Sequence, residues 1–210
     1  MTRIGASKHL DACAPLHDVA SGGVESVGRF RVIAIGAPQY WIDVEARMSA
    51  TLSSLDNLLR RTWLECCGHL SMFEVRPFRY LPVGVGSLDP FGRREFERAM
   101  STRIGAAFAY VGMKGVYQYD FGSTTGLGLA LTAAREGRLG RAAVRIATRN
   151  NPPIWPCAVC AQPASLVCCV HETDDSAFVC EQHQRKHACK GRAFLPVVNS
   201  PRMGVCGYAG

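Results

Sequence analysis

The 210-residue chain has few lysines, no long apolar run and no complete catalytic signature. Only four of its 24 basic residues are lysines. No stretch approaches the roughly 20 apolar residues that a membrane-spanning helix requires, and the first 18 residues lack the continuous apolar segment of a secretory signal. These absences favour a cytoplasmic protein with no membrane partner. The 20 arginines give a net charge of +7, which is compatible with a polyanionic partner but does not identify one.

Cysteine is the residue that the chain has in excess, and its distribution is uneven. Three of the ten cysteines lie in the first 150 residues and seven lie in the last 60. Cysteines of a reducing compartment act as metal ligands, nucleophiles or small buried residues more often than as disulfide partners. With 48% hydrophobic and 20% charged positions, the chain can bury one core and support one small added module.

Residues 29–150 have the pattern of an α+β domain, preceded by a flexible leader over 1–28. Strand patterns over 29–36 and 40–48 predict a hairpin, whose second strand alternates between a buried face and a solvent face. Thr51 is a predicted N-cap, because leucines recur after it at helical spacing. The fold class is therefore α+β, with a mostly antiparallel or mixed sheet packed by helices.

The rest of this domain is predicted from turn residues and short apolar runs. We expect an irregular connection over 76–91, a short helix over 93–100, and strands over 117–121, 127–133 and 142–148, with a turn at 135–138. Two asparagines and two prolines at 150–153 then end the pattern and mark the domain boundary.

The segment 151–210 carries the strongest chemical signal, a series of cysteine and histidine pairs. Thiolate and imidazole pairs separated by one or two residues can face one cation, and four such ligands complete the tetrahedron that Zn²⁺ prefers. The spacing therefore predicts a structural zinc-knuckle module that binds one or two ions through Cys157, Cys160, Cys168, His171, Cys180, His183, His187 and Cys189.

Two ligand assignments are open at this point. In the interleaved one, the first and third pairs bind one ion and the second and fourth pairs bind another. In the other, a single ion is held by Cys157 and Cys160 with one later pair. We expect closed structural sites, because the chain has no His-Glu-x-x-His motif and no His-x-Glu partner for a Pro-Cys-x-x-Cys motif. Cys169 and Cys206 are not assigned to either ion.

Other candidate sites have weaker support. Cys66, Cys67 and His69 have the chemistry of a nucleophile or a second metal site, but we expect two small buried cysteines and a core histidine. Asp120 in Asp-Phe-Gly lacks the other kinase motifs and is predicted to end a strand. An arginine-rich strand face could follow a phosphate backbone through Arg138, Arg141, Arg145 and Arg149.

Four parts of the chain together resemble a known family. They are TLSSLDNLLRRTWLECCGHLSMF (51–73), YQYDFGSTTGL (117–127), the Cys/His pairs, and LPVVNSPRMGVCGY (195–208). In this order they resemble the plasmid Ri Orf-three-like family, whose members also occur as passenger proteins of bacterial insertion elements.

The resemblance implies a compact α+β domain, a C-terminal zinc-binding tail in a subset of members, and no established biochemical activity. This chain has His171 and His183 where cysteine is more usual, and either residue type can bind zinc. In other branches of the family, the resemblance implies His-Leu-His at the place of residues 69–71. This chain has Ser71 in the last of these positions, which disfavours a site made of two histidines.

The sequence thus predicts a zinc-binding, non-enzymatic binding protein of plasmid or mobile-element origin. The two alternatives are a nucleic-acid-binding accessory protein that uses the arginine face, and a hydrolase or nuclease that uses Cys66, His69 or Asp120. The partner could be a protein or a nucleic acid, and the sequence does not distinguish them.

Overall fold

The computed structural model describes residues 3–85, 94–171, 175–189 and 193–210. The chain divides into two units, Met1–Arg60 with Leu70–Asn150, and Arg61–His69 with Asn151–Gly210. The predicted boundary after Asn150 coincides with this division. The sequence pattern places residues 61–69 in the 29–150 domain, whereas in the structure they belong to the same unit as the C-terminal segment.

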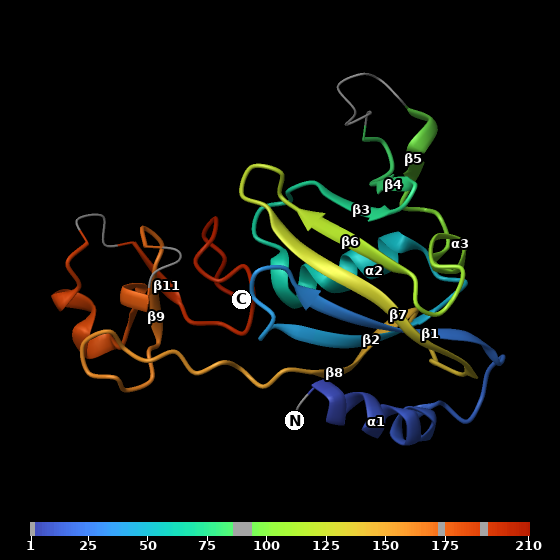
Figure 1. Ribbon diagram of the computed structural model, residues 1–210, viewed down its shortest axis with the longest axis horizontal. Helices are drawn as coiled ribbons and strands as arrows, with labels where there is room; N and C mark the ends of the chain where they lie inside the picture. Colours follow the sequence, from blue (N-terminus) through green and yellow to red (C-terminus); the bar gives the residue numbers. More distant parts are fainter. Residues whose placement is uncertain (1–2, 86–93, 172–174, 190–192) are drawn as a thin grey trace. The chain divides into compact units, whose positions relative to one another are not determined.

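The first unit is an α+β structure built on an eight-stranded mixed sheet (Figure 1). Its strand order is β5-β4-β3-β6-β7-β1-β2-β8, and the pairing of β4 with β5 is the parallel one in this sheet. The strands are β1 (Glu25–Ala34), β2 (Trp41–Arg47), β3 (Ser71–Val75), β4 (Phe78–Leu81), β5 (Glu97–Ala99), β6 (Lys114–Tyr119), β7 (Thr125–Gly137) and β8 (Val144–Arg149).

The predicted hairpin and the predicted helix cap are both confirmed. β1 and β2 pair in antiparallel register from Val27↔Arg47 to Ile33↔Trp41. Helix α2 (Leu52–Leu59) begins after Thr51, whose side chain accepts a hydrogen bond from the backbone N–H of Ser54. This bond satisfies one of the N–H groups that the first helical turn leaves without a partner.

The expectation of a solvent-facing side on β2 was wrong. Asp43 and Glu45 lie on that side and are only 1% and 2% exposed. Arg31 donates two hydrogen bonds to Asp43, and Arg135 and Arg145 donate to Glu45. Alternation of polar and apolar residues predicted the strand correctly, but the polar side is buried because arginines from neighbouring strands neutralise its carboxylates.

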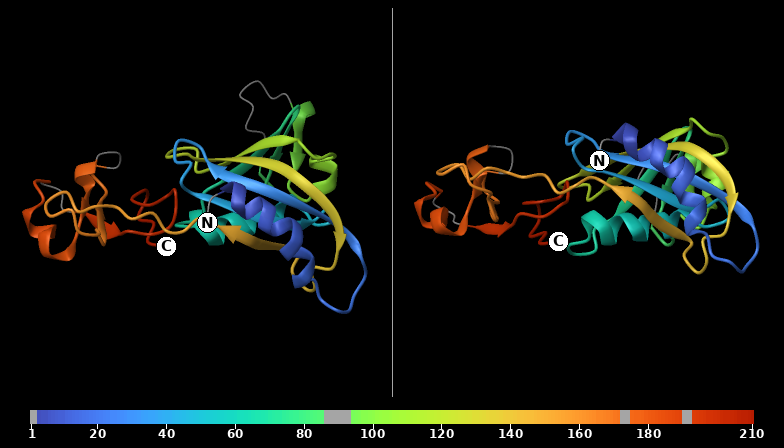
Figure 2. Two further views of the ribbon diagram at one scale, coloured as in Figure 1. Left: turned by 60° about the horizontal axis from the view of Figure 1, so that its bottom comes forward. Right: turned by 90° about the horizontal axis from the view of Figure 1, so that it is seen from below.

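The expectation of a flexible leader over 1–28 was also wrong. Helix α1 (Arg3–Cys13) and a 3₁₀ turn over Ala14–His17 precede β1, which begins at Glu25. Arg145 donates to the backbone carbonyl of His17 at 2.8 Å. Figure 2 shows α1 and α2 on opposite faces of the sheet. The N-terminal segment therefore covers the polar face that the sequence pattern assigned to solvent.

Asp18 anchors this segment, and its titration gives a test. It accepts hydrogen bonds from two Arg135 nitrogens at 2.8 Å and from the Arg138 backbone N–H at 2.9 Å. The hydrogen bonds from Arg135 lower the pKa of Asp18 from 3.8 to about 2, and burial opposes the shift only in part. A carboxylate with a lowered folded-state pKa contributes stability that is complete well above pH 3.8 and is lost as the pH falls to about 2.

We expect Asp18→Asn to destabilise the protein near neutral pH by about 1 kcal/mol, since solvent partly screens the ion pair. The difference between the wild type and the variant should disappear as the pH approaches 2. Urea denaturation at a series of pH values measures it, and comparing the two proteins at each pH cancels acid effects common to both. A difference that stays constant down to pH 2 would contradict the role of the ionised carboxylate.

The first unit differs from the prediction in four further places. The irregular connection over 76–91 contains β4, and its residues 86–91 lie outside the described residues. Within the predicted helix over 93–100, the described residues form a 3₁₀ turn, Arg94–Phe96, followed by β5, and residue 93 lies outside the described part of the chain. The predicted turn at 135–138 is largely strand, since β7 continues to Gly137. A short helix, α3 (Ile104–Ala107), was not predicted.

The second unit contains a three-stranded sheet with a small core. The strands are β9 (Leu166–Cys168), β10 (Phe178–Val179) and β11 (Phe194–Pro196), in the order β10-β9-β11. Its buried cluster consists of Val167, Cys168, Ala177, Phe178 and Cys189. Two of these five residues are predicted metal ligands, and six partly buried hydrophobic residues pack against the cluster. Across the described parts of both units, no helix combines the length and apolarity needed to cross a membrane.

Candidate metal centres

The first predicted ligand group lies together in the second unit. Its ligand atoms come within 4.8 Å of one another and belong to Cys157, Cys160, Cys180 and His183. Cys180 precedes a 3₁₀ helix, Glu181–Lys186, and one turn of that helix brings His183 back toward it, with Sγ and Nδ1 3.3 Å apart. The first Cys pair lies in the turn after Pro156, where the Ala161 backbone N–H donates to the carbonyl of Cys157.

The second group combines the two remaining pairs. Its four ligand atoms also lie within 4.8 Å of one another and belong to Cys168, His171, His187 and Cys189. Cys168 ends β9 and is buried, as is Cys189. Within the group, His171 Nδ1 and His187 Nε2 lie 3.1 Å apart. This grouping is that of the interleaved assignment, and ion binding itself stays a prediction.

The distances within these groups match the edges of a metal tetrahedron. Around Zn²⁺, with bonds of about 2.3 Å to sulfur and about 2.05 Å to nitrogen, the edges are about 3.8 Å for S···S, about 3.5 Å for S···N and about 3.3 Å for N···N. Observed values are 3.9 Å between the sulfurs of Cys160 and Cys180, 3.7 Å from Cys157 Sγ to His183 Nδ1, and 3.1 Å for the histidine pair. Both groups could therefore hold one cation each.

The local electrostatics of the first group favour a thiolate. Burial disfavours ionisation of Cys157, but backbone N–H groups, foremost that of Cys180, donate to its sulfur, and the pKa of Cys157 falls from 9.0 to about 6. Backbone donors at a cysteine knuckle stabilise negative sulfur in the same way when it binds a cation. Cys157 is thus prepared for metal ligation.

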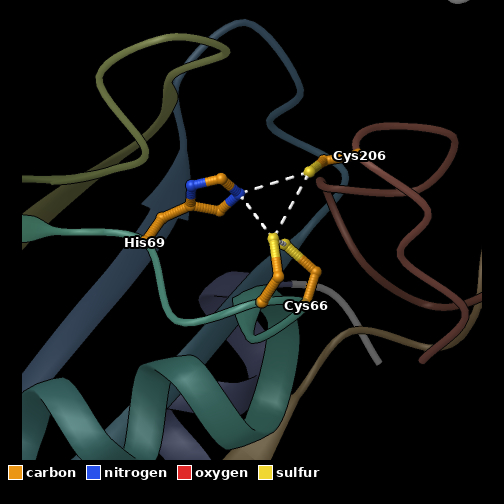
Figure 3. A group of neighbouring side chains, drawn as sticks. Cys66, His69 and Cys206 are labelled. Atoms are coloured by element: carbon orange, nitrogen blue, oxygen red, sulfur yellow. Dashed lines mark hydrogen bonds between the residues drawn. The ribbon is translucent and has the colours of Figure 1, made fainter.

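A third group was not expected, and it corrects the prediction for Cys66, Cys67 and His69. We expected two buried cysteines and a core histidine, whereas Cys67 is exposed and the other two are half-buried. Their ligand atoms meet the thiol of Cys206 within 4.8 Å. Figure 3 shows Cys66 and His69 beside Cys206 of the C-terminal loop. The one sequence cue was the close spacing of residues 66–69, because Cys206 lies 139 positions beyond Cys67.

The predicted arginine-rich strand face does not form. A register shift in the pairing of β2 with β8 leaves Arg145 opposite Glu45 and Arg149 opposite Ile42. Residues paired across strands share a face, so this bulge puts the two arginines on opposite faces. Arg145 is neutralised by Glu45 at 2.5 Å, while Arg138 donates to the Gly22 carbonyl and Arg141 lies outside the strand. Nucleic-acid binding stays a prediction, and β8 does not present a continuous row of arginines on one face that would support it.

The residues of the hydrolase alternative belong to different units. Cys66 and His69 lie in the second unit and Asp120 in the first. Asp120 has φ 63° and is nearly buried, and its carboxylate accepts a hydrogen bond from the Gly122 backbone N–H at 3.0 Å. This geometry is that of a turn after β6, as the sequence predicted. The hydrolase alternative stays an untested prediction.

The fold and the three groups define an α+β protein with several Cys/His sets that could hold metal ions. No family model matches the chain, and no curated protein matches it. It is similar to a crystal structure of a protein of unknown function from Methanosarcina mazei Go1, with 16% identity and a TM-score of 0.47. That similarity covers 60% of this chain and 69% of the other.

Proposed function

We propose that the segment 151–210 is a structural two-zinc module of a non-enzymatic binding protein. The observation that carries this proposal is the interleaving of two four-ligand sets, Cys₃His and Cys₂His₂, along 33 consecutive positions. Sulfur and imidazole donors in a tetrahedral arrangement select Zn²⁺ over Mg²⁺ or Ca²⁺. Four protein ligands leave no coordination position for a substrate or an activated water, so such sites stabilise structure.

Interleaving also explains how so small a core can be ordered. Each ion joins pairs that are separated by the other ion's ligands, so neither half of the segment can fold without the other. The apolar contribution includes the cluster around Val167 and Phe178 and the partly buried hydrophobic residues packed against it, with Trp155 stacked on Phe178 at 4.5 Å. Metal binding then contributes most of the folding free energy.

Replacing the metal by Co²⁺ tests whether the sites are closed. We expect tetrahedral thiolate and imidazole absorption bands that do not change when cyanide or azide is added, because no ligand position is exchangeable. Bands that shift on adding an anion would show an open position and would favour catalysis over a structural role.

Adjacent cysteines provide a matched pair of variants for the ligand assignment. Cys168→Ser should remove at least one equivalent of zinc per chain, since Cys168 belongs to the second group, whereas Cys169→Ser should retain the wild-type amount, since Cys169 belongs to none of the three groups. Metal content measured by inductively coupled plasma mass spectrometry decides this. Equal zinc in both variants would contradict the assignment.

Membership of the plasmid Ri Orf-three-like family remains part of the proposal and is supported by the sequence segments at 51–73, 117–127 and 195–208. A plasmid or mobile-element origin and a cytoplasmic location follow from that membership and from the reduced cysteines. No disulfide joins any of the ten cysteines, all of which lie in described parts of the chain. The binding partner is the unassigned part of this function.

A further inference from the structure

The third cluster consists of Cys66, Cys67, His69 and Cys206, and it lies outside the two sites of the proposed module. The contacts among these side chains are 3.7 Å between the sulfurs of Cys66 and Cys67, and 3.6 Å between those of Cys67 and Cys206. His69 Nε2 lies 2.9 Å from the sulfur of Cys67 and 3.2 Å from that of Cys206. All four residues belong to the second unit.

These distances fit a metal site and do not fit a disulfide. The two S···S separations are close to the edge of about 3.8 Å of a zinc tetrahedron and far from the S–S bond of about 2.05 Å. The two S···N separations are somewhat shorter than the tetrahedral edge of about 3.5 Å, and a cation placed among these atoms would spread them. Three thiols and one imidazole are a complete structural zinc set.

The backbone on both sides of the cluster is shaped to bring the ligands together. Gly68 has φ +77° and allows the chain to reverse between Cys67 and His69. Cys206 has φ +50° and is followed by Gly207 at φ +71°, which forms a tight turn around the fourth ligand. A left-handed conformation is costly for cysteine, so the surroundings must fix it.

The two segments that carry the ligands are also joined near the cluster. The hydroxyl of Ser200 donates a hydrogen bond of 2.6 Å to the backbone carbonyl of Trp63. Both residues are buried, and Trp63 is fully so. The approach of the C-terminal segment to residues 61–69 therefore rests on packing and hydrogen bonding as well as on the four ligand side chains.

We propose that Cys66, Cys67, His69 and Cys206 form a third zinc site, which cross-links the C-terminal segment to residues 66–69. The cross-link closes a loop of more than one hundred residues, and long closed loops restrict the unfolded chain most. This site differs from the other two in accessibility. Cys67 and Cys206 are exposed, whereas each proposed module site contains a buried cysteine. The third ion is thus the one that a chelator in solution reaches first.

Zinc release to a chromogenic chelator tests this inference on the native full-length protein. We expect one equivalent in a fast phase and the remainder in a slow phase. Cys206→Ser should abolish the fast phase and leave the slow phase unchanged, while the control Cys13→Ser, at a cysteine outside the three groups, should keep both phases. A fast phase that is absent from the wild type, or that persists in Cys206→Ser, would overturn the third site.

Alkylation of the wild-type protein provides a second test that does not depend on the folding of a variant. Iodoacetamide followed by peptide mass spectrometry should label Cys13 from the start and should label Cys67 and Cys206 only after the fast-releasing zinc has been removed. Labelling of both exposed cysteines in the zinc-loaded protein would overturn the inference, as would a disulfide between Cys67 and Cys66 or Cys206. Failure of the two-zinc module would instead appear as loss of the slow release phase.

Discussion

Removing zinc from the native protein should unfold much of the segment 151–210 and leave the eight-stranded sheet folded. Zinc ligation to Cys/His sites contributes about 10 to 16 kcal/mol of apparent binding free energy near neutral pH, which we expect to exceed the contribution of the small apolar cluster around Val167 and Phe178. The sheet has its own core, including Phe30, Val32, Ile42 and Val44, all fully buried. Its stability does not depend on the Cys/His groups.

Hydrogen exchange measures both outcomes in one experiment. After treatment with a strong chelator, the backbone amides of β9 and β10 should lose their protection, while those of β1 and β7 should keep theirs. Adding Zn²⁺ back should restore protection, and adding Mg²⁺ should not, because thiolate and imidazole ligands disfavour hard cations. Protection of β9 that survives complete removal of zinc would show that apolar packing holds the segment and would refute a structural role for the metal.

The sequence predicted the two interleaved groups as one of two open assignments, because their ligands are close together in the chain. Pairs separated by one or two residues can bind one ion regardless of the remaining fold, so spacing alone is informative. Cys206 offers no such cue, since it is a single cysteine 137 positions from His69, its nearest partner along the chain in the third group. Finding it required the position of the C-terminal loop, which depends on tertiary contacts such as that between Ser200 and Trp63.

The errors in the sheet have a related cause. Alternation predicted β2 and its hairpin, but it could not reveal that Asp43 and Glu45 face arginines instead of water. α1 has almost no apolar periodicity, and the 3₁₀ turn that follows it contacts β8 through the backbone carbonyls of Ala14 and His17, which leave no pattern in the sequence. The bulge that separates Arg145 from Arg149 depends on the register with β2. These features depend on pairing between distant segments, which local propensity does not encode.

Glu45→Ala should destabilise the first unit by about 3 to 5 kcal/mol, the cost of removing one member of a buried charge pair. Glu45 is 2% exposed and accepts hydrogen bonds from Arg135 at 3.0 Å and from Arg145 at 2.5 Å. Hydrogen bonds to Asp18 and Glu45 raise the pKa of Arg135 despite its partial burial, so this guanidinium cannot lose its charge to relieve the loss. Arg135 would retain Asp18, while Arg145 would lose its nearest carboxylate.

The matched control is Glu74→Ala, which removes a carboxylate from β3, another strand of the same sheet. Glu74 pairs with Arg76 at 3.5 Å, and the side chain of Arg76 is 92% exposed. An exposed pair of this kind contributes at most about 1 kcal/mol. The free energies of unfolding of the two zinc-loaded variants are compared by urea denaturation. Hydrogen exchange of the β2 amides then shows whether the loss of stability is located at that strand. Equal effects would contradict the buried charge network.

Glu45→Ala also discriminates between a structural role and a phosphate-binding role for Arg145. If Arg145 is a structural cation, Glu45→Ala lowers stability and leaves the affinity for DNA or RNA weak at all salt concentrations. If Arg145 belongs to a phosphate-binding face, removing its carboxylate partner frees positive charge and strengthens binding, with a steeper dependence on salt. The buried Glu45 and the opposite facing of Arg149 support the first outcome, so a mobility-shift assay of Glu45→Ala beside the wild type should show no gain in binding.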